Sequence, residues 1–375
     1  MSAVSRWVDV AHLTVVHRRH DTRIFVKEAR SLAASGLRVG LLVMDGLGDD
    51  ERDGVDIRDL GPPPATRLRR FCLGSLRTLR AIRRLQPRVV HFHDPELIPV
   101  AVLIRLMGIR VVYDVHEDLP RQVAYKRWIP RRARRGVAVA SGAIEGLAAA
   151  VFDRIVAATP VIAARFPASK VVMVRNFPIL AEMAQPAAVP ISDRGAIVAY
   201  VGGYQTVRGI DQMVDALQHC PPQVELWMAG RFDSEAVAGC VRSKTGWSRV
   251  RDHGWLDREG VANLLASACV GVVILQPVQN LEAAYPVKLF EYMAAGLPVI
   301  ASDFPAWRDL LSGTDCALFV DPTDPEAIAS AIETVTSDRA LATKLGENGR
   351  LGVERHYSWA TEETALLDSY TPLLA

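Results

Sequence analysis

Short apolar runs alternate with amphipathic stretches along the first half of the chain, and this alternation predicts strands separated by helices. The stretch 24–35 places Phe25, Ala29 and Leu32 on one helical face. Gly36 follows it as a residue suited to the left-handed end of a helix. The strands expected in this half are 8–16, 37–44, 88–92, 110–115 and 154–158.

A second helix of this half has a marked start and end. Asp94 belongs to the residue types that cap helix N-termini, Pro95 suits the first helical position, and Glu96 favours the positive end of a helix. The helix is expected to end before Gly108.

The pattern lapses at residues 184–190, which contain two prolines, and restarts beyond them. At roughly 150 residues per domain, 375 residues favour two domains, with the boundary after residue 185. The strands expected in the second half are 196–201, 224–229, 270–275, 298–301 and 317–320, and Asp324 and Pro325 open a later helix. Such alternation predicts an α/β protein with two parallel sheets, whose ligands bind beyond the carboxyl ends of the strands.

Cysteine usage and the lack of long apolar segments indicate a cytoplasmic protein. The five cysteines are scattered without any CxxC pair, which disfavours a disulfide framework or a zinc site. The first residues lead directly into a strand-like run, without the features of a signal peptide. No apolar stretch reaches the roughly 20 residues that span a bilayer.

Charge is divided unevenly between the halves. Residues 1–185 hold 30 Lys and Arg against 18 Asp and Glu, whereas residues 186–375 hold 14 against 24. The basic half therefore suits an anionic partner, either nucleic acid or a membrane surface. The alternative is a solvated basic face that docks partly against the acidic half.

Two basic segments favour the membrane over nucleic acid. Segments 67–84 and 125–135 interleave cations with apolar or aromatic residues, a composition that suits an anionic leaflet. No nucleic-acid module is present in the sequence. We therefore expect no nucleic-acid partner, and peripheral attachment to the inner face of the cell membrane at most.

One helix of the second half carries the strongest chemical signal. Pro286 can start this helix and Gly296 can end it, so Lys288 and Glu291 share one face of its first turns. A helix N-terminus attracts phosphate, a lysine there adds a full charge, and a carboxylate one turn further can accept bonds from a ribose diol. The alternative is a surface ion pair between the two side chains.

At this point the chain resembles the retaining GT-B glycosyltransferases of family 4. Residues 288–302, Lys-Leu-Phe-Glu-Tyr-Met-Ala-Ala-Gly-Leu-Pro-Val-Ile-Ala-Ser, resemble the donor-site helix of that family. Its acceptor half is matched by three other segments: 14–25, 89–97 and 112–120. Residues 200–203, Tyr-Val-Gly-Gly, followed by Arg208 and Gly209, resemble the loop that opens the donor domain.

The resemblance implies two facing Rossmann-like domains with the active site in the cleft between them. Residues 1–185 would form the acceptor-binding domain and residues 186–355 the nucleotide-sugar-binding domain. Residues 356–375 would form a last helix that crosses back to the first domain.

The resemblance also implies a set of site residues. His116 would lie beside the transferred sugar, and Arg208 and Lys288 would balance the charge of the leaving diphosphate. A partly buried, hydrogen-bonded histidine is the alternative for His116, and Asp114 and Glu117 could orient it. The donor site would comprise Gly202, Gly203, Arg208, Lys288 and Glu291, and the acceptor side Asp21, Arg23, His93 and Asp94.

Three positions depart from the family pattern, and no metal or other cofactor is expected. Ala283 stands where the family usually has a first glutamate, Gly203 stands where it has an arginine, and segment 17–23 lacks its usual glycines. His91 and His93 look superficially like metal ligands beside Asp94 and Glu96, but Asp94 is better explained as a helix cap.

The sequence thus predicts a glycosyltransferase of cell-surface polysaccharide or glycolipid synthesis. It would move a sugar from a nucleoside-diphosphate donor to a saccharide or lipid-linked acceptor with retention of configuration. UDP is the favoured nucleotide, with GDP-mannose as the other candidate. The rival functions are a nucleotide-sugar epimerase of the same fold and a non-catalytic sugar-nucleotide-binding subunit. A nicotinamide dehydrogenase is disfavoured because no GxGxxG follows the first strand.

Overall fold

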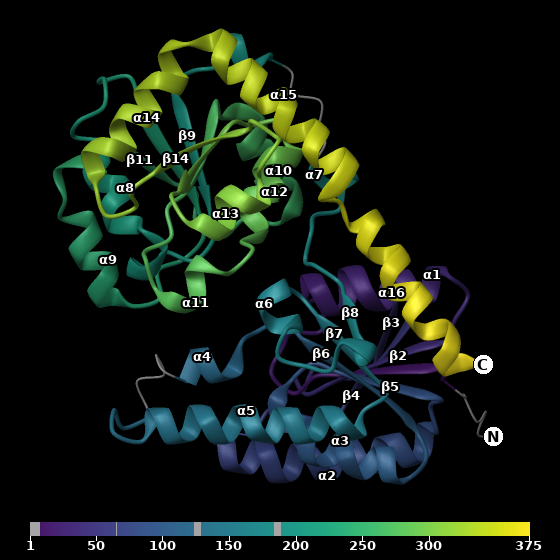
Figure 1. Ribbon diagram of the computed structural model, residues 1–375. Coiled ribbons are helices and arrows are strands. Elements are labelled where there is room, and N and C mark those ends of the chain that lie inside the picture. The colour runs from purple at the N-terminus through teal and green to yellow at the C-terminus, as the bar shows by residue number, and fades with distance from the viewer. Residues whose placement is uncertain (1–7, 65, 124–128, 184–188) are drawn as a thin grey trace. The chain divides into compact units, whose positions relative to one another are not determined.

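The computed structural model describes residues 8–64, 66–123, 129–183 and 189–375. The chain divides into two compact units (Figure 1). Unit 1 comprises Met1–Asn176 and Ala360–Ala375, and unit 2 comprises Phe177–Trp359. The sequence placed the boundary after residue 185, within a segment of which residues 184–188 lie outside the described part of the chain.

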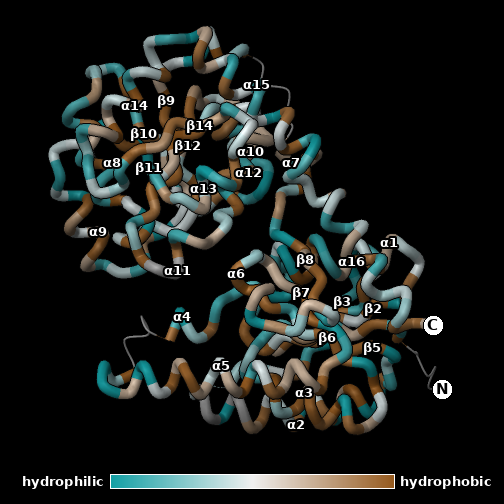
Figure 2. Tube along the Cα trace, in the orientation of Figure 1, coloured by the Kyte–Doolittle hydropathy of each residue, from teal (hydrophilic) through white to brown (hydrophobic). Residues whose placement is uncertain are grey.

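Unit 1 is built on an eight-stranded sheet of order β3-β4-β2-β1-β5-β6-β7-β8, in which only β3 is antiparallel to its neighbour. Its central strands β1 and β5 are buried on both faces because helices cover both, and Figure 2 shows hydrophobic segments along the strands of this sheet. The strands are β1 (Val10–Leu13), β2 (Val39–Val43), β3 (Asp50–Arg52), β4 (Val55–Asp59), β5 (Val89–Phe92), β6 (Arg110–Val115), β7 (Arg154–Ala157) and β8 (Val171–Met173).

Two layers of helices cover this sheet (Figure 1). The long helices α2 (Arg67–Leu85), α3 (Ile98–Leu106) and α5 (Arg134–Val151) lie on one side, where Ile82, Ile104 and Ala149 join the core. The π-helical turn η1 (Thr22–Ala29), α1 (Arg30–Ala34) and α16 (Trp359–Leu374) lie on the other. Shorter helices are η2 (Pro95–Leu97), α4 (Leu119–Val123), α6 (Pro160–Ala163) and η3 (Ala168–Lys170).

The last helix belongs to unit 1 although the preceding residues belong to unit 2. Glu362 of α16 accepts hydrogen bonds from the Arg175 backbone N–H (2.6 Å) and from Arg175 Nη1 (2.9 Å). Leu366 and Tyr370 are fully buried against the same unit. Polar and apolar contacts together therefore hold α16 to unit 1.

Unit 2 holds a six-stranded, fully parallel sheet of order β11-β10-β9-β12-β13-β14. Its strands are β9 (Ile197–Val201), β10 (Glu225–Ala229), β11 (Val250–Asp252), β12 (Val270–Val273), β13 (Val299–Ser302) and β14 (Ala317–Val320). Its helices are α7 (Leu180–Met183), η4 (Ile191–Asp193), η5 (Thr206–Arg208), α8 (Ile210–Ala216), α9 (Glu235–Arg242), η6 (Thr245–Arg249), α10 (Arg258–Ser267), α11 (Gln279–Glu282), α12 (Val287–Ala294), α13 (Pro305–Leu310), α14 (Pro325–Ser337) and α15 (Arg339–His356).

Both sheets have a topological switch point, which is the place in the strand order where the chain stops adding strands on one side and begins to add them on the other. In unit 1 it lies between β1 and β5, and in unit 2 between β9 and β12. Ligands of open α/β sheets bind outside the carboxyl ends of the strands at this point. The fold therefore marks the loops after β1 and β5, and the loop after β9, as the places to look for a site.

Within the described residues, no helix has the length and apolar character needed to cross a membrane.

Candidate functional site

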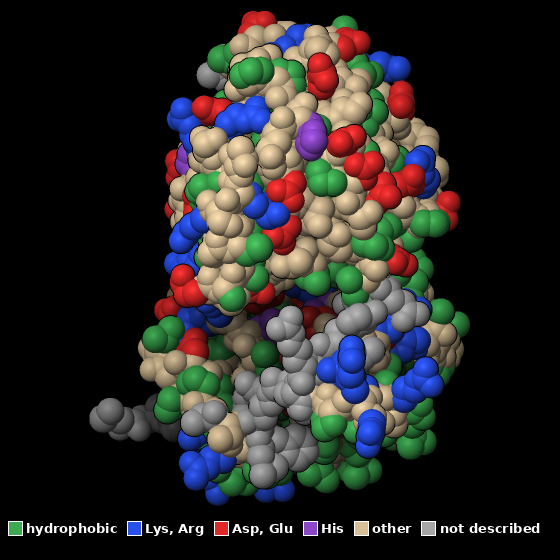
Figure 3. Space-filling view, turned by 90° about the vertical axis from the view of Figure 1, so that its left-hand side faces the viewer, with side chains coloured by type: hydrophobic (Ala, Val, Ile, Leu, Met, Phe, Trp, Pro, Cys, Tyr) green, Lys and Arg blue, Asp and Glu red, His purple; other side chains and the backbone are tan. Residues whose placement is uncertain are grey.

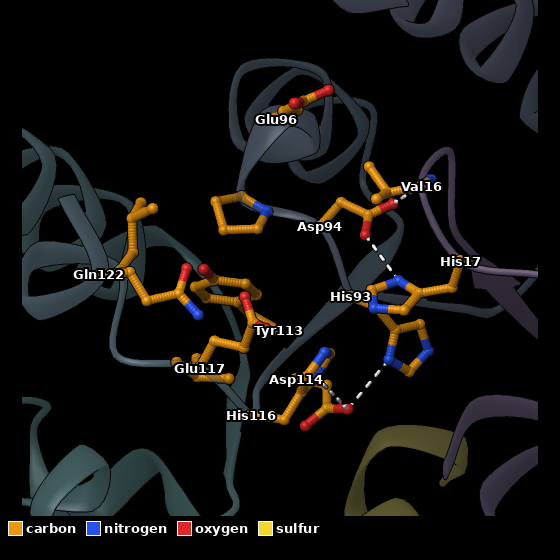
Figure 4. A pocket seen from close by; sticks show the side chains of 13 residues that line it. Val16, His17, His93, Asp94, Glu96, Tyr113, Asp114, His116, Glu117 and Gln122 are labelled. Atoms are coloured by element: carbon orange, nitrogen blue, oxygen red, sulfur yellow. Dashed lines mark hydrogen bonds and ion pairs between the residues drawn. The ribbon is translucent and has the colours of Figure 1, made fainter. Parts of the chain in front are cut away.

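A pocket of about 200 Å³ opens at the switch point of unit 1 (Figure 4). Residues at or just beyond the carboxyl ends of β1, β5 and β6 line it, so three neighbouring strands deliver their side chains to one point. The lining residues are Val16, His17, His93, Asp94, Pro95, Glu96, Tyr113, Asp114, Val115, His116, Glu117, Leu119 and Gln122.

Asp94 organises the loop that forms one wall of this pocket. Its Oδ2 accepts hydrogen bonds from the backbone N–H groups of Val15 (2.6 Å) and Val16 (3.2 Å) and from the Thr14 hydroxyl (3.0 Å). Its Oδ1 lies 2.9 Å from His17 Nδ1. The expectation that Asp94 caps the following helix is wrong, because its side chain makes no cap bond there and is used by the β1 loop.

The contact between His17 and Asp94 favours the charged form of both side chains. Burial opposes the ions, but the hydrogen bond between the two side chains and their mutual attraction lower the pKa of Asp94 and raise that of His17. A protonated His17 would thus present a positive edge to the pocket near neutral pH. The sequence analysis did not single out His17, although its position after a strand end was a usable signal.

His116 lies across the same pocket and is held by a buried carboxylate. Its Nδ1 is 3.3 Å from Asp114 Oδ2, and its side chain is 19% exposed while that of Asp114 is fully buried. Arg23 donates two 2.8 Å bonds to Asp114, from Nε and Nη2. Despite burial, the attraction of Arg23 and the bonds from the histidines hold the pKa of Asp114 well below its usual value.

The ionised Asp114 fixes the tautomers of two further histidines. His93 Nδ1 lies 2.9 Å from Asp114 Oδ2 and must donate to it, so the neutral ring accepts at Nε2. His12 Nδ1, 3.0 Å from that Nε2, is then the donor. Burial lowers the pKa of both rings, which agrees with this neutral arrangement.

The polar cluster continues behind the pocket to the C-terminal helix. His91 Nδ1 lies 2.6 Å from the Tyr370 hydroxyl of α16, and Glu28 Oε1 lies 3.1 Å from Arg23 Nε. Burial raises the pKa of Glu28 well above its usual value. Four of these side chains, His12, Glu28, His91 and His93, are of types that bind metals and lie close together. The tautomers derived above commit the facing nitrogens of His12 and His93 to each other, whereas His12 Nε2, His91 Nε2 and both carboxylate oxygens of Glu28 have no hydrogen-bond partner among the described residues.

The four residues assigned to the acceptor side therefore divide into two pairs. His93 and Asp94 line the pocket. Asp21 instead caps η1, since its side chain accepts from the backbone N–H groups of Arg23 (2.8 Å) and Ile24 (3.0 Å). Arg23 is buried and bound to Asp114, which makes it a structural support of the pocket.

In unit 2, the loop after β9 brings together three of the predicted donor-site residues. A Cβ added to Gly202 would lie 2.8 Å from Lys288 Nζ and 3.4 Å from Arg208 Nη1. Gly202 has φ +137°, and two further glycines fit this loop to its neighbours. A Cβ on Gly209 would lie 2.0 Å from the Ile274 carbonyl oxygen, and one on Gly230 would lie 2.0 Å from that of Gly202. Two cations, Lys288 and Arg208, thus lie beside the backbone of Gly202, which carries no side chain.

The Lys288 side chain is buried, and its Nζ has no hydrogen-bond acceptor among the described residues. It lies in the first turn of α12, with Nζ 3.9 Å from the centre of the Tyr200 ring. Burial and the nearby Arg208 charge lower its pKa well below the usual value. A buried charge without a partner is costly, so this position suits an anion that arrives from solution.

Glu291 lies one turn along α12, and its carboxylate accepts a 3.1 Å bond from Arg258 Nη1. The same guanidinium also donates to Glu182. Among the described ion pairs Glu291 is therefore joined to Arg258, and the alternative of a surface pair between Lys288 and Glu291 is wrong. Gly203 contributes backbone only, as its carbonyl accepts from the Tyr200 hydroxyl at 2.8 Å.

Two family profiles match the chain, one on each unit. The family described as "Glycosyltransferase Family 4" matches residues 22–176, and the one described as "Glycosyl transferases group 1" matches residues 195–338.

Curated relatives match about half of the chain. A phosphatidyl-myo-inositol mannosyltransferase of Mycobacterium leprae (strain TN) is 30% identical over 182 residues, which are 47% of this chain and 46% of that protein. The lipopolysaccharide core biosynthesis glycosyltransferase LpsE of Rhizobium meliloti (strain 1021) is 30% identical over 186 residues, 48% and 49% of the two chains. The chain thus spans about half the length of the curated relatives it matches.

Solved structures extend the likeness to nearly the whole chain. Sucrose-phosphate synthase from Thermosynechococcus elongatus has a TM-score of 0.76 at 21% identity, over 97% of this chain and 98% of that chain. The Anabaena protein HepE in complex with UDP-glucose has a TM-score of 0.75 at 14% identity, over 97% and 100%. At these identities the likeness shows the fold, which is that of GT-B glycosyltransferases. With both units matched in order by the two profiles, the chain belongs to the group 1, family 4 glycosyltransferases.

Proposed function

We propose that this chain transfers a sugar from a nucleoside-diphosphate donor to a saccharide or lipid-linked acceptor, with retention of configuration. The observation that carries the proposal is the buried Lys288 ammonium, which lies beside Arg208 and Gly202 and has no acceptor among the described residues. A diphosphate supplies the negative charge that this position lacks.

The proposed chemistry needs charge stabilisation at the leaving group. As the bond between the sugar C1 and the diphosphate oxygen breaks, negative charge grows on the diphosphate, and pre-placed cations stabilise it most strongly there. Lys288 and Arg208 would meet this charge together with the free amides of the first turn of α12. The acceptor oxygen forms the new bond to C1, and its proton passes to the departing diphosphate, so neither a protein base nor a metal is required.

The pocket of unit 1 is the proposed place for the sugar and acceptor. His116 offers a polarised ring edge, since its Nδ1 is turned to Asp114 and leaves Nε2 for the substrate. His17 and Asp94 add a charged pair that can hold sugar hydroxyls. Retention is taken from the family resemblance.

UDP is the favoured nucleotide, because the fold neighbour HepE was solved with UDP-glucose. GDP-mannose is the other candidate, because a relative is a phosphatidyl-myo-inositol mannosyltransferase. The names of that relative and of LpsE also support a lipid-linked or lipopolysaccharide acceptor in cell-envelope synthesis.

A nucleotide screen followed by substitution at Lys288 tests the proposal. UDP, GDP and their sugars are compared by thermal shift, since a ligand that binds only the folded state raises the melting temperature. The preferred nucleotide should bind Lys288→Ala at least about tenfold more weakly by calorimetry, as expected when a charged hydrogen bond is lost. Lys344→Ala is the matched control, because that lysine of unit 2 is exposed and paired with Asp315. Equal nucleotide affinity of wild type and Lys288→Ala would overturn the proposal.

Turnover separates the rival functions. Release of nucleoside diphosphate should require an acceptor, whereas an epimerase would convert UDP-GlcNAc alone and a binding subunit would release nothing. Arg208→Ala and Lys288→Ala should each reduce turnover by roughly 10²–10³. Because both act on one diphosphate, the double variant should deviate from additivity. EDTA should leave the wild type active, and a metal requirement would show that the charge is handled elsewhere.

A further inference from the structure

The outward side of α3 and α5 in unit 1 is apolar. Leu106, Val139 and Leu147 are 75%, 74% and 74% exposed, and Leu103 and Ile144 are about half exposed. We call these five residues the α3–α5 face. Single exposed aliphatic residues are ordinary on a protein surface, but a group of them on neighbouring helices marks a binding surface.

Helix α5 departs from the usual pattern of a surface helix. Such a helix turns its polar side to water. Here every exposed position after Arg135 is glycine, alanine, valine, isoleucine or leucine, and Glu145, which is the single charged residue of that stretch, is fully buried. Glu145 accepts a 2.9 Å bond from the Tyr113 hydroxyl and also binds Arg165. Water is therefore a poor environment for the outward side of α5.

Helix α3 continues the apolar surface beside α5. Both helices pack on the same side of the sheet through one core, and Figure 2 shows hydrophobic stretches along both, with the hydrophilic end of α5 at its start. The exposed positions of α3 include Leu103 and Leu106, and the exposed Met107 follows them.

Cations without carboxylates flank this surface on two sides. Residues 60–93, which include α2 next to α3, contain eight arginines and no Asp or Glu. Residues 129–144, which lead into α5 and form its first part, contain four arginines and again no Asp or Glu. Figure 3 looks onto the end of unit 1 where α5 begins and shows Lys and Arg side chains gathered there beside hydrophobic ones. The segment 125–135, which the sequence suggested as membrane-binding, is described only from Ile129 onward.

We propose that the α3–α5 face inserts among the acyl chains at the surface of an anionic lipid leaflet, with the flanking arginines on lipid phosphates. Aliphatic side chains gain by leaving water, and Arg matches phosphate geometry well. A surface that binds another protein is expected to carry mixed charges and aromatic anchors. The five residues of the α3–α5 face include neither. This inference does not depend on the sugar-transfer reaction.

Vesicle binding by the full chain tests the proposal. Co-sedimentation compares vesicles of phosphatidylcholine alone with vesicles of phosphatidylcholine and 30% phosphatidylglycerol. Each is tested at about 0.1 M and about 0.5 M salt, because salt screens only the electrostatic part of the binding free energy. The wild type should bind the anionic vesicles and keep part of that binding at the higher salt. Leu106→Ser with Leu147→Ser should weaken partition at least about tenfold, given the apolar area removed.

Matched controls separate insertion from other causes. Leu351→Ser with Trp255→Ser changes two exposed apolar residues of unit 2 and should bind as wild type. Arg80→Ala with Arg83→Ala should weaken binding at low salt and matter little at high salt. Circular dichroism and nucleotide binding confirm folding of each variant. The proposal is overturned if the leucine variant binds like wild type, if no vesicle is bound, or if light scattering shows a dimer that the leucine changes convert to monomer.

Discussion

At the residue scale, the partners of a buried charged side chain indicate whether that side chain supports the structure or binds a ligand. Asp114 is surrounded by Arg23, His93 and His116, so its charge is fully compensated and its role is to hold other groups. Lys288 has no acceptor in the part of the chain that the structure describes, and it lies next to a second cation. Because an uncompensated buried charge destabilises a fold, such a charge indicates a ligand that is bound during function.

His116 is expected to act on turnover more than on binding. Its ring lies in the unit 1 pocket, whereas the nucleotide is assigned to unit 2, so His116→Ala should leave nucleotide affinity nearly unchanged while lowering kcat strongly. Calorimetry with the preferred nucleotide and a turnover assay measure the two separately. Parallel losses of activity and melting temperature would instead favour a purely structural histidine.

Glu291 is expected to bind the ribose of the donor. Its carboxylate is held near the start of α12 by Arg258, which orients it. Glu291→Gln keeps the shape but weakens charge-assisted bonds, each worth roughly 1.5–3 kcal/mol, so nucleotide affinity should fall about tenfold or more. The exposed Glu354→Gln is the control, because Glu354 pairs only with Arg350 on the surface of α15. Unchanged affinity in Glu291→Gln would reject the assignment.

At the scale of elements, α16 is predicted to stabilise unit 1 through a specific polar contact. Tyr370 is fully buried, and its hydroxyl is 2.6 Å from His91 Nδ1. Tyr370→Phe leaves that nitrogen without its partner, which should cost about 1–3 kcal/mol of unfolding free energy. Urea unfolding followed by circular dichroism measures the loss. Thr371→Ala changes an exposed neighbour on the same helix and should have little effect; equal stability of wild type and Tyr370→Phe would contradict the prediction.

The elements predicted from the sequence were those with strong apolar periodicity. Strands buried on both faces, such as Arg110–Val115, have an unmistakable pattern, whereas the hairpin of β3 and β4 is largely charged and was missed. The short strands β8 and β11 were missed for similar reasons, since their residues are half-buried or exposed. Helix 24–35 was predicted as one element, but it begins earlier as a π-helical turn because Asp21 caps it.

The candidate site was predictable only where local sequence carries the signal. Lys288 lies at the recognisable start of a helix, and Gly202 follows the recognisable end of a strand. The structure brings the two residues together. The contacts of His12 with His93 and of Tyr370 with His91 join residues from distant parts of the chain, and no local pattern marks them. Asp94 was found as a polar residue after a strand, but its true partners are four residues of the distant β1 loop: Thr14, Val15, Val16 and His17.

At the scale of the whole molecule, each unit has its own core, and we therefore expect the two units to show separate unfolding transitions. Most tryptophans lie in unit 2: Trp227, Trp247, Trp255, Trp307 and Trp359, out of seven in the chain. Tryptophan fluorescence therefore reports mainly on unit 2, while circular dichroism reports on both. This difference allows the two units to be followed in one sample.

Unit 1 is predicted to lose stability in mild acid before unit 2. Burial holds the pKa of His12, His91 and His93 below the ordinary value of 6.5, so the folded state excludes protons that the unfolded state binds. Their contribution is complete above about pH 6.5 and is lost as the pH falls below it, by about 1.4 kcal/mol per pH unit for each net proton.

Two groups of unit 1 oppose this loss. The raised pKa values of Glu28 and His17 favour folding as the pH falls, whereas the lowered pKa values of the three buried histidines oppose it, and we expect the histidines to dominate. As the pH is lowered from 7.5 to 5.5, the melting temperature measured by circular dichroism should therefore fall. The melting temperature measured by tryptophan fluorescence should change less. Coincident transitions at every pH would show that the two units unfold together, and a unit 1 that is more stable at pH 5.5 would contradict the assignment of neutral buried histidines.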